Sequence, residues 1–137
     1  MANEAVLLFE TGHAIPFTCA DGTGIEKGAI LTLSNPMTVA TSTTQNAAVG
    51  GIAAAEKIAN DGCTKIPVFR SGIFKVYASG SVVTGGALKI SADDAAARNY
   101  IAAAAADDED IIGIALEDAT VGQTFKMELR PTAVEQA

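Results

Sequence analysis

Few residues in this chain have the side chains that a reactive site needs. His13 is the only histidine, so a Ser–His–Asp or Cys–His site would have to include it. It stands beside Gly12 near the N-terminus, and the sequence has no GxSxG, HExxH, GxGxxG or P-loop motif. A single histidine is more often a surface residue than a catalytic one. The sequence therefore predicts no catalytic residue and a protein that is not an enzyme.

An acidic run at residues 107–110 is the stretch that could attract a metal ion. Asp107, Asp108, Glu109 and Asp110 offer the oxygen ligands that Ca²⁺ prefers, but they lack the spacing and the glycine of an EF-hand loop. Adjacent acids usually form a solvated surface, and a zinc site would need more histidine and cysteine. We expect no metal site and no cofactor, although cation binding by this run stays open.

Cys19 and Cys63 are the only cysteines, and neither belongs to a CxxC motif. Two cysteines in a chain of 137 residues do not make a disulfide framework. The sequence predicts two reduced thiols that are buried or half-buried.

The charge balance excludes two classes of partner. The chain has 16 acidic and 9 basic residues, a net charge of −7. A nucleic-acid-binding protein needs a basic face, and an anionic membrane repels an acidic protein, so neither partner is expected. The apolar segment AVLLF at residues 5–9 is too short for a signal peptide or a membrane span. We therefore expect synthesis and use without export from the cytoplasm.

Glycine-rich turns divide the chain into short segments that are typical of β-strands. Several of these segments alternate, so that Phe125, Met127 and Leu129 share one face of their strand, and Phe74 and Val76 share one face of another. This pattern predicts an all-β fold, a small antiparallel β-barrel or sandwich. The expected strands are AVLLF, AILTL, KIPVF, IFKVY, ALKI, IIGIAL and TFKMEL.

Two stretches could form short helical turns. Residues 53–61 contain good helix formers and end at Asp-Gly. Residues 92–110 are rich in alanine, which offers little apolar area to bury. For the second stretch we expect a loop and a short strand around residues 99–103, with a helical turn at 92–98 as the alternative.

Similar phrases recur in the two halves of the chain. GIA occurs at 51–53 and 113–115, and A-x-x-G-x-T begins at Ala59 and at Ala119. An arginine stands six residues after the threonine of each copy, at Arg70 and Arg130. Upstream, GAILTLS at 28–34 resembles GALKIS at 86–91. A glycine before Ile-Ala would allow a bulge or a close approach of two strands. Chance matching among alanines and glycines is the alternative to a true repeat.

The repeat predicts a duplicated β-unit, at about residues 25–70 and 83–130. We expect the two units to wrap around one shared core, because a few strands cannot bury a core alone. The predicted organisation is an N-terminal arm at 1–18, a single barrel-like domain at 19–131 and a C-terminal tail at 132–137.

The order of these phrases resembles the small capsid decoration, or cement, proteins of tailed bacteriophages. The resemblance rests on EKGAILTL and TGGALKI, on GGIAAAEKIANDG and IIGIALEDATVG, and on SGIFKV between the halves, and it covers residues 10–131. It implies a β-barrel-like protein, made in the host cytoplasm, that binds the major capsid protein on the outer surface of the virion. It also implies a homotrimer that bridges neighbouring capsomers, with no catalysis and no cofactor.

The apolar N-terminal segment is the predicted interface. We expect it to add a strand to a neighbour or to dock in a groove of the shell, through Ala5, Val6, Leu7, Leu8, Phe9, Ile15 and Phe17. Two other functions stay open on the sequence alone: a small-ligand-binding barrel or accessory subunit, and a non-viral self-assembling structural protein.

Overall fold

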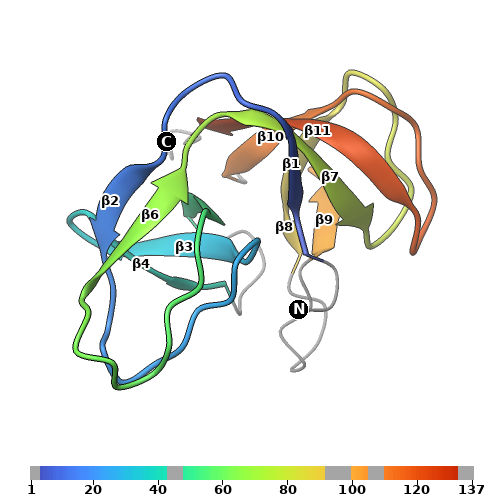
Figure 1. Cartoon of the computed structure of the whole chain (residues 1–137). Coiled ribbons are helices and arrows are strands. Elements are labelled where there is room, and N and C mark those ends of the chain that lie inside the picture. Colours follow the sequence, from blue (N-terminus) through green and yellow to red (C-terminus); the bar gives the residue numbers. More distant parts are fainter. Residues whose placement is uncertain (1–3, 43–47, 92–99, 105–109, 133–137) are drawn as a thin grey trace, which may run out of the picture.

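Eleven β-strands and their connections make up the described part of the chain, which comprises residues 4–42, 48–91, 100–104 and 110–132 of a computed structural model (Figure 1). No helix occurs among these residues, and the predicted all-β class is confirmed. The strands are β1 (Val6–Phe9), β2 (Ile15–Thr18), β3 (Ile30–Asn35), β4 (Thr38–Thr41), β5 (Val49–Ala53), β6 (Lys65–Phe69), β7 (Gly72–Ala78), β8 (Ala87–Ser91), β9 (Tyr100–Ala103), β10 (Ile111–Ala115) and β11 (Thr124–Thr132).

The strands form two closed five-stranded barrels with the same topology (Figure 1). The first barrel has the order β2-β4-β3-β5-β6, and the second has the order β7-β9-β8-β10-β11. All neighbours are antiparallel except the first and third strands of each unit, which are parallel. This parallel contact is Thr18 with Thr38 in the first barrel, and Tyr77 with Tyr100 in the second. The predicted duplication is therefore confirmed, although the first strands of the two units, β2 and β7, lie outside the predicted ranges of 25–70 and 83–130.

The expectation of one shared core is wrong, because each unit closes on itself and fills its own interior. The core of the first barrel consists of Phe17, Cys19, Ile25, Ala29, Leu31, Val39, Ala53, Ile66 and Val68. The core of the second barrel is larger, and it extends outward to Ile30, Val49 and Ile52 of the first barrel. Strands β3 and β5 thus join the two barrels through apolar contacts.

The register of the duplication differs from the one that the sequence predicts. Isolated bridges pair Ile25 with Lys57 and Val82 with Ala119, so Lys57, and not Ala59, is the counterpart of Ala119. The match of Arg70 with Arg130 is also wrong, because the strand pairings make Leu129 the counterpart of Arg70. The connection that follows the bridge is longer in the first barrel, and such insertions shift a repeat that is read from the sequence alone.

The alternation of the strands is confirmed, since Phe74, Val76, Phe125, Met127 and Leu129 are all buried. The strand expected around residues 99–103 is β9, whereas the alternative helical turn at 92–98 lies outside the described residues.

The helical turn expected at 53–61 is wrong. Ala53 ends β5, and the residues after it run as bends and turns. Lys57 within this stretch pairs instead with Ile25, in an isolated bridge. Tertiary pairing therefore overrides the helix propensity of this short alanine-rich stretch.

The two GIA phrases mark the tightest contacts between strands. Gly51 has a φ of 135°, and a Cβ atom there would collide with the carbonyl oxygen of Phe69 on β6. At the equivalent Gly113, a Cβ atom would collide with the carbonyl oxygen of Glu128 on β11. Only glycine lets neighbouring backbones approach so closely in a strongly curved sheet. The predicted role of these glycines in a close approach is confirmed.

We predict that Gly51→Ala and Gly113→Ala each lower the free energy of unfolding by about 2–4 kcal/mol, because the new methyl group forces two strands apart. Chemical denaturation followed by circular dichroism measures the change. Gly80→Ala is the matched control, since nothing lies within 4 Å of a Cβ atom at that position. Equal stability of all three variants would contradict the close-approach explanation.

Candidate functional site

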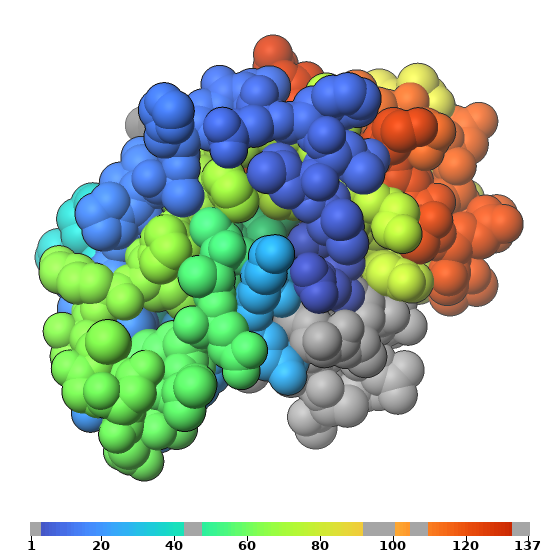
Figure 2. All heavy atoms as spheres, in the orientation of Figure 1, coloured from blue at the N-terminus to red at the C-terminus, as the bar shows by residue number. Residues whose placement is uncertain are grey.

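The N-terminal segment joins the two barrels. β1 pairs antiparallel with the first half of β7, as in the pair of Val6 with Lys75. β9 pairs in parallel with the second half of β7, along the same edge of that strand. On the other side, the backbone N–H of Ala5 donates to the carbonyl oxygen of Gly28 in the first barrel, at 3.1 Å. Figure 2 shows this segment, in blue, lying across the surface of both barrels. The N-terminal segment with β1 therefore lies over the junction between the two barrels and contacts both of them.

The residues predicted to form the interface separate into two groups. Ala5 and Phe17 are buried and Leu7 is half-buried, so these side chains belong to the protein's own packing. The exposed group comprises Val6, Leu8, Phe9, which is 60% exposed, and Ile15. The pairing of β1 with β7 shifts between Leu7 and Phe9, which breaks the alternation of the strand there. Only the exposed group can contact a partner without unfolding, and its interface role stays a prediction.

β2 and β7 are equivalent strands of the two barrels. β1 pairs with one edge of β7, and β2 has an equivalent edge. In the described part of the chain, β2 meets β4 only at Thr18, so residues 14–16 carry no strand on that side. Pro16 is the counterpart of Lys75, because Pro16 pairs with Pro67 and Lys75 with Lys126. Proline has no N–H to donate, and it commonly blocks strand addition at an exposed edge. The sequence thus favours pairing of β1 with β7 over pairing with β2.

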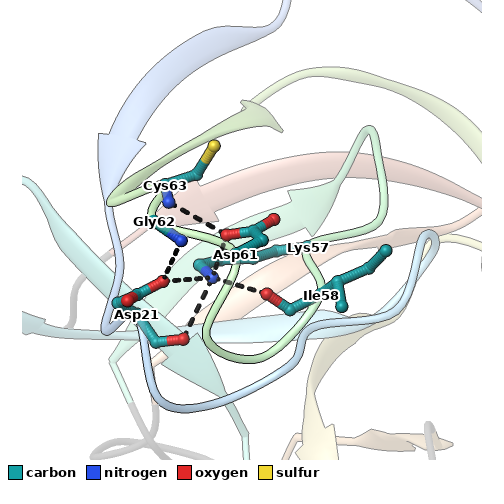
Figure 3. Close-up of polar contacts among 6 residues, drawn as sticks. All are labelled: Asp21, Lys57, Ile58, Asp61, Gly62 and Cys63. Carbon is teal, nitrogen blue, oxygen red and sulfur yellow. Dashed lines mark hydrogen bonds and ion pairs between the residues drawn. The ribbon is translucent and has the colours of Figure 1, made fainter.

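A buried lysine forms the densest polar cluster among the described residues (Figure 3). The ammonium group of Lys57 donates to Oδ1 of Asp61 at 2.8 Å, to Oδ1 of Asp21 at 3.2 Å, and to the carbonyl oxygens of Ile58 and Asp21 at 2.8 and 3.1 Å. Its side chain is only 2% exposed. The cluster ties the loop after β2 to the loop before β6.

Both carboxylates also accept backbone hydrogen bonds. Oδ1 of Asp21 accepts from the N–H of Gly62, and Oδ1 of Asp61 accepts from the N–H of Cys63, both at 2.9 Å. The hydrogen bond to Lys57 is the main cause that lowers the pKa of Asp61 below its ordinary value. The hydrogen bond to Asp61 likewise raises the pKa of Lys57.

A lysine held as an ammonium ion is neither a nucleophile nor a base, so the cluster is a structural tie. Its counterpart in the second barrel is the uncharged Ala119. Sequence reasoning missed the cluster because residues 53–61 read as a helical turn. The one available signal was the i,i+4 spacing of Lys57 and Asp61.

The two cysteines lie next to this cluster, and the histidine lies on another connection. Cys19 is buried as predicted, and burial is the main cause that raises the pKa of its thiol. Cys63 is exposed, so the prediction of a buried or half-buried thiol is wrong for it; it lies on the extended loop after Asp61. His13 is exposed on the connection between β1 and β2. The structure does not bring these residues together with the N-terminal interface residues into one site.

The acidic run is described only at Asp110, which is half-buried; Asp107, Asp108 and Glu109 lie outside the described residues. Within the described ranges, no group of three or more histidine, cysteine or acidic residues is placed to hold a metal ion. In those ranges there is likewise no helix with the length and hydrophobicity of a membrane span.

A crevice of about 330 Å³ lies at the junction between the two barrels, beside β1. Its lining includes Leu7, Phe69 and Phe74, with Glu4 and Lys27 as its charged residues. A small-ligand site usually has several convergent polar groups, and this lining is mostly apolar.

We predict that Lys57→Met lowers the melting temperature at pH 7 by roughly 5–10 °C, because Asp21, Asp61 and two carbonyl groups lose their shared donor. The folded protein lowers the pKa of Asp61, so this stability is present above the ordinary value of 3.8 and is lost as pH falls further. Lys57, with a raised pKa, keeps its contribution up to its ordinary value of 10.5 and loses it above that. The difference between wild type and variant should therefore be constant near neutrality and shrink below pH 4.

Differential scanning fluorimetry between pH 2.5 and 9 measures this difference. Lys126→Met is the control, because it breaks an ion pair with Glu117 whose side chains are 48% and 46% exposed, and such pairs contribute little. Equal, pH-independent effects of the two variants would contradict a structural role for the Lys57 cluster.

Comparison with known proteins shows that this chain shares the fold of a solved structure. No protein-family model matches the sequence, and no curated protein matches it. Among solved structures, the chain is similar to the gp8.5 N base of the head fiber in bacteriophage phi29, with a TM-score of 0.56 and 15% sequence identity. The match covers 89% of this chain and 98% of that chain, so the likeness includes both barrels. At this identity, the comparison establishes a shared fold.

Proposed function

We propose that this chain is a structural protein of a tailed bacteriophage, attached to the outer surface of the head. The observation that carries the proposal is the likeness of fold to a phage head fiber base over nearly the whole of both chains. The phage decoration proteins that the sequence resembles belong to the same class of head-associated proteins. Two independent resemblances, one in sequence order and one in fold, thus favour the same kind of protein.

The finer proposal is that the chain acts as a cement protein. It binds the major capsid protein, bridges neighbouring capsomers and stabilises the shell without catalysis or cofactor. A ligand that binds only the assembled shell stabilises it by mass action. A homotrimer would make several contacts at once, so that modest contacts add up through effective concentration. The net charge of −7 suits a protein that stays soluble until it meets the shell.

The exposed face of β1 is the proposed contact with the shell or with a neighbouring copy. Val6, Leu8, Phe9 and Ile15 are exposed apolar residues on one continuous segment. β1 itself is already paired with β7, so a partner would dock on its side chains or extend its unpaired edge.

We predict that the purified chain sediments with empty, expanded heads of its phage and raises the temperature at which those heads rupture. Analytical ultracentrifugation of the free protein should give three times the chain mass of 13.9 kDa. A protein that binds no heads would contradict head attachment. A monomer that binds heads would contradict only the trimer.

We predict that Leu8→Glu combined with Phe9→Glu weakens head binding at least tenfold and leaves the melting temperature within about 2 °C, because both side chains are exposed. Deleting residues 1–18 is a poorer test, since it also removes β2 and the buried Phe17. Leu33→Glu is the control, because Leu33 and Leu8 are equally exposed, at 38%. Equal binding by the double variant and the wild type would exclude the β1 face as the contact.

A further inference from the structure

Two loops at one end of the second barrel carry exposed apolar side chains. One loop, residues 79–86, joins β7 to β8, and the other, residues 116–123, joins β10 to β11; they lie side by side at the right of Figure 1. Backbone hydrogen bonds of 2.9 and 3.1 Å between Val82 and Ala119 hold them together. Val83 and Val121 are 66% and 71% exposed, and Leu116 is also exposed. We call these two loops the second-barrel tip.

The sister barrel shows that the fold does not require these apolar residues. The N–H of Gly86 donates to the carbonyl oxygen of Val83 as the N–H of Ala29 donates to Glu26, so Glu26 is the counterpart of Val83. In the same way, the N–H of Leu116 donates to the carbonyl oxygen of Lys126 as the N–H of Ala54 donates to that of Pro67, so Ala54 is the counterpart of Leu116.

The aligned bridges also make Ala59 the counterpart of Val121. Three large apolar residues of the tip thus correspond to glutamate and alanine at the same backbone positions: Val83 to Glu26, Leu116 to Ala54 and Val121 to Ala59. In the opposite direction, the exposed Ile58 of the first barrel corresponds to Thr120 of the tip.

The tip also has a shape and a charge that a partner could recognise. A depression of about 300 Å³ is lined by residues that include Val83, Ala119, Thr120 and Gln123. Asp118 borders it, and Oδ1 of Asp118 accepts hydrogen bonds from the N–H and the hydroxyl of Thr84 at 2.8 and 2.9 Å. These bonds lower the pKa of Asp118 below its ordinary value, so it stays ionised in mildly acidic solution.

No basic residue occurs in either loop of the tip. The other acid there, Glu117, is paired with Lys126 at 3.3 Å. A depression lined by the exposed Val83 and by an unneutralised carboxylate complements a surface with an apolar projection and a neighbouring lysine or arginine. Contact between two tips is disfavoured, because it would bring two Asp118 carboxylates together in a chain that is already strongly acidic.

We propose that the second-barrel tip is a docking surface for the phage head, and that it fits a site with an apolar projection beside a basic side chain. This inference rests on the proposed function and adds a second contact, separate in sequence from β1. A protein that bridges two capsomers needs at least two separate contacts on one molecule. The first barrel, with glutamate and alanine at the corresponding positions, does not share this property.

The test replaces tip residues by their counterparts from the first barrel. Val83→Glu with Val121→Ala should weaken cosedimentation with empty heads at least tenfold, with an unchanged melting temperature, because both side chains are exposed. Asp118→Asn should weaken binding by a smaller factor and reduce its dependence on salt. The reciprocal variant Ile58→Thr is the control and should bind as the wild type does, although Ile58 is 65% exposed. Leu116→Ala provides a second variant that introduces no charge.

Each outcome separates the inference from the proposed function. Wild-type binding with loss in the tip variants and normal binding by Ile58→Thr would support the docking surface. Equal binding by all variants would overturn it and leave head attachment intact. A tip variant that changes the mass of the free protein, and not its binding to heads, would also overturn it, since the tip would then be a contact between copies. Absence of wild-type binding would overturn the proposed function, and the inference with it.

Discussion

Closure of each barrel depends on a short parallel contact between the first and third strands of its unit, made by Thr18 with Thr38 and by Tyr77 with Tyr100. Without this contact, five strands would form an open sheet with two unprotected edges. A barrel of so few strands is strongly curved, and it leaves room for little more than one layer of side chains. The glycines at 51 and 113 and the small, aromatic-poor composition both follow from this constraint.

Duplication produced two similar barrels whose loops now differ in chemistry. In the first barrel, the longer loops are tied by Lys57 and its two aspartates, whereas the same position in the second barrel holds Ala119. The shorter loops of the second barrel instead expose Val83 and Val121. A fold that is stabilised by its strands can tolerate such changes, because loops contribute less to the core than strands do. The two ends of the molecule are consequently suited to different surroundings.

Much of the fold could be predicted from the sequence, and the misses have physical causes. Alternation identified the strands that carry large residues on one face, such as Phe125 and Met127. It missed β4, a short strand without that signal, and it did not assign β2 to the barrel. The repeat was found through GIA, but insertions in the next connection hid that Lys57 corresponds to Ala119. The Lys57 cluster also depends on Asp21 in a loop that is distant in sequence, so the local spacing of Lys57 and Asp61 could not reveal the whole cluster.

The path of β1 has a consequence for how the molecule is built. β1 is translated before the first barrel, yet its partner β7 is translated only after all five strands of that barrel. The first barrel contains all of its own strands, so it can close before β7 is translated. Until then, β1 has no strand partner. Pro16 disfavours pairing of β1 with the edge of β2, because proline has no N–H to donate. The contacts of β1 with both barrels therefore require residues that are translated well after β1 itself.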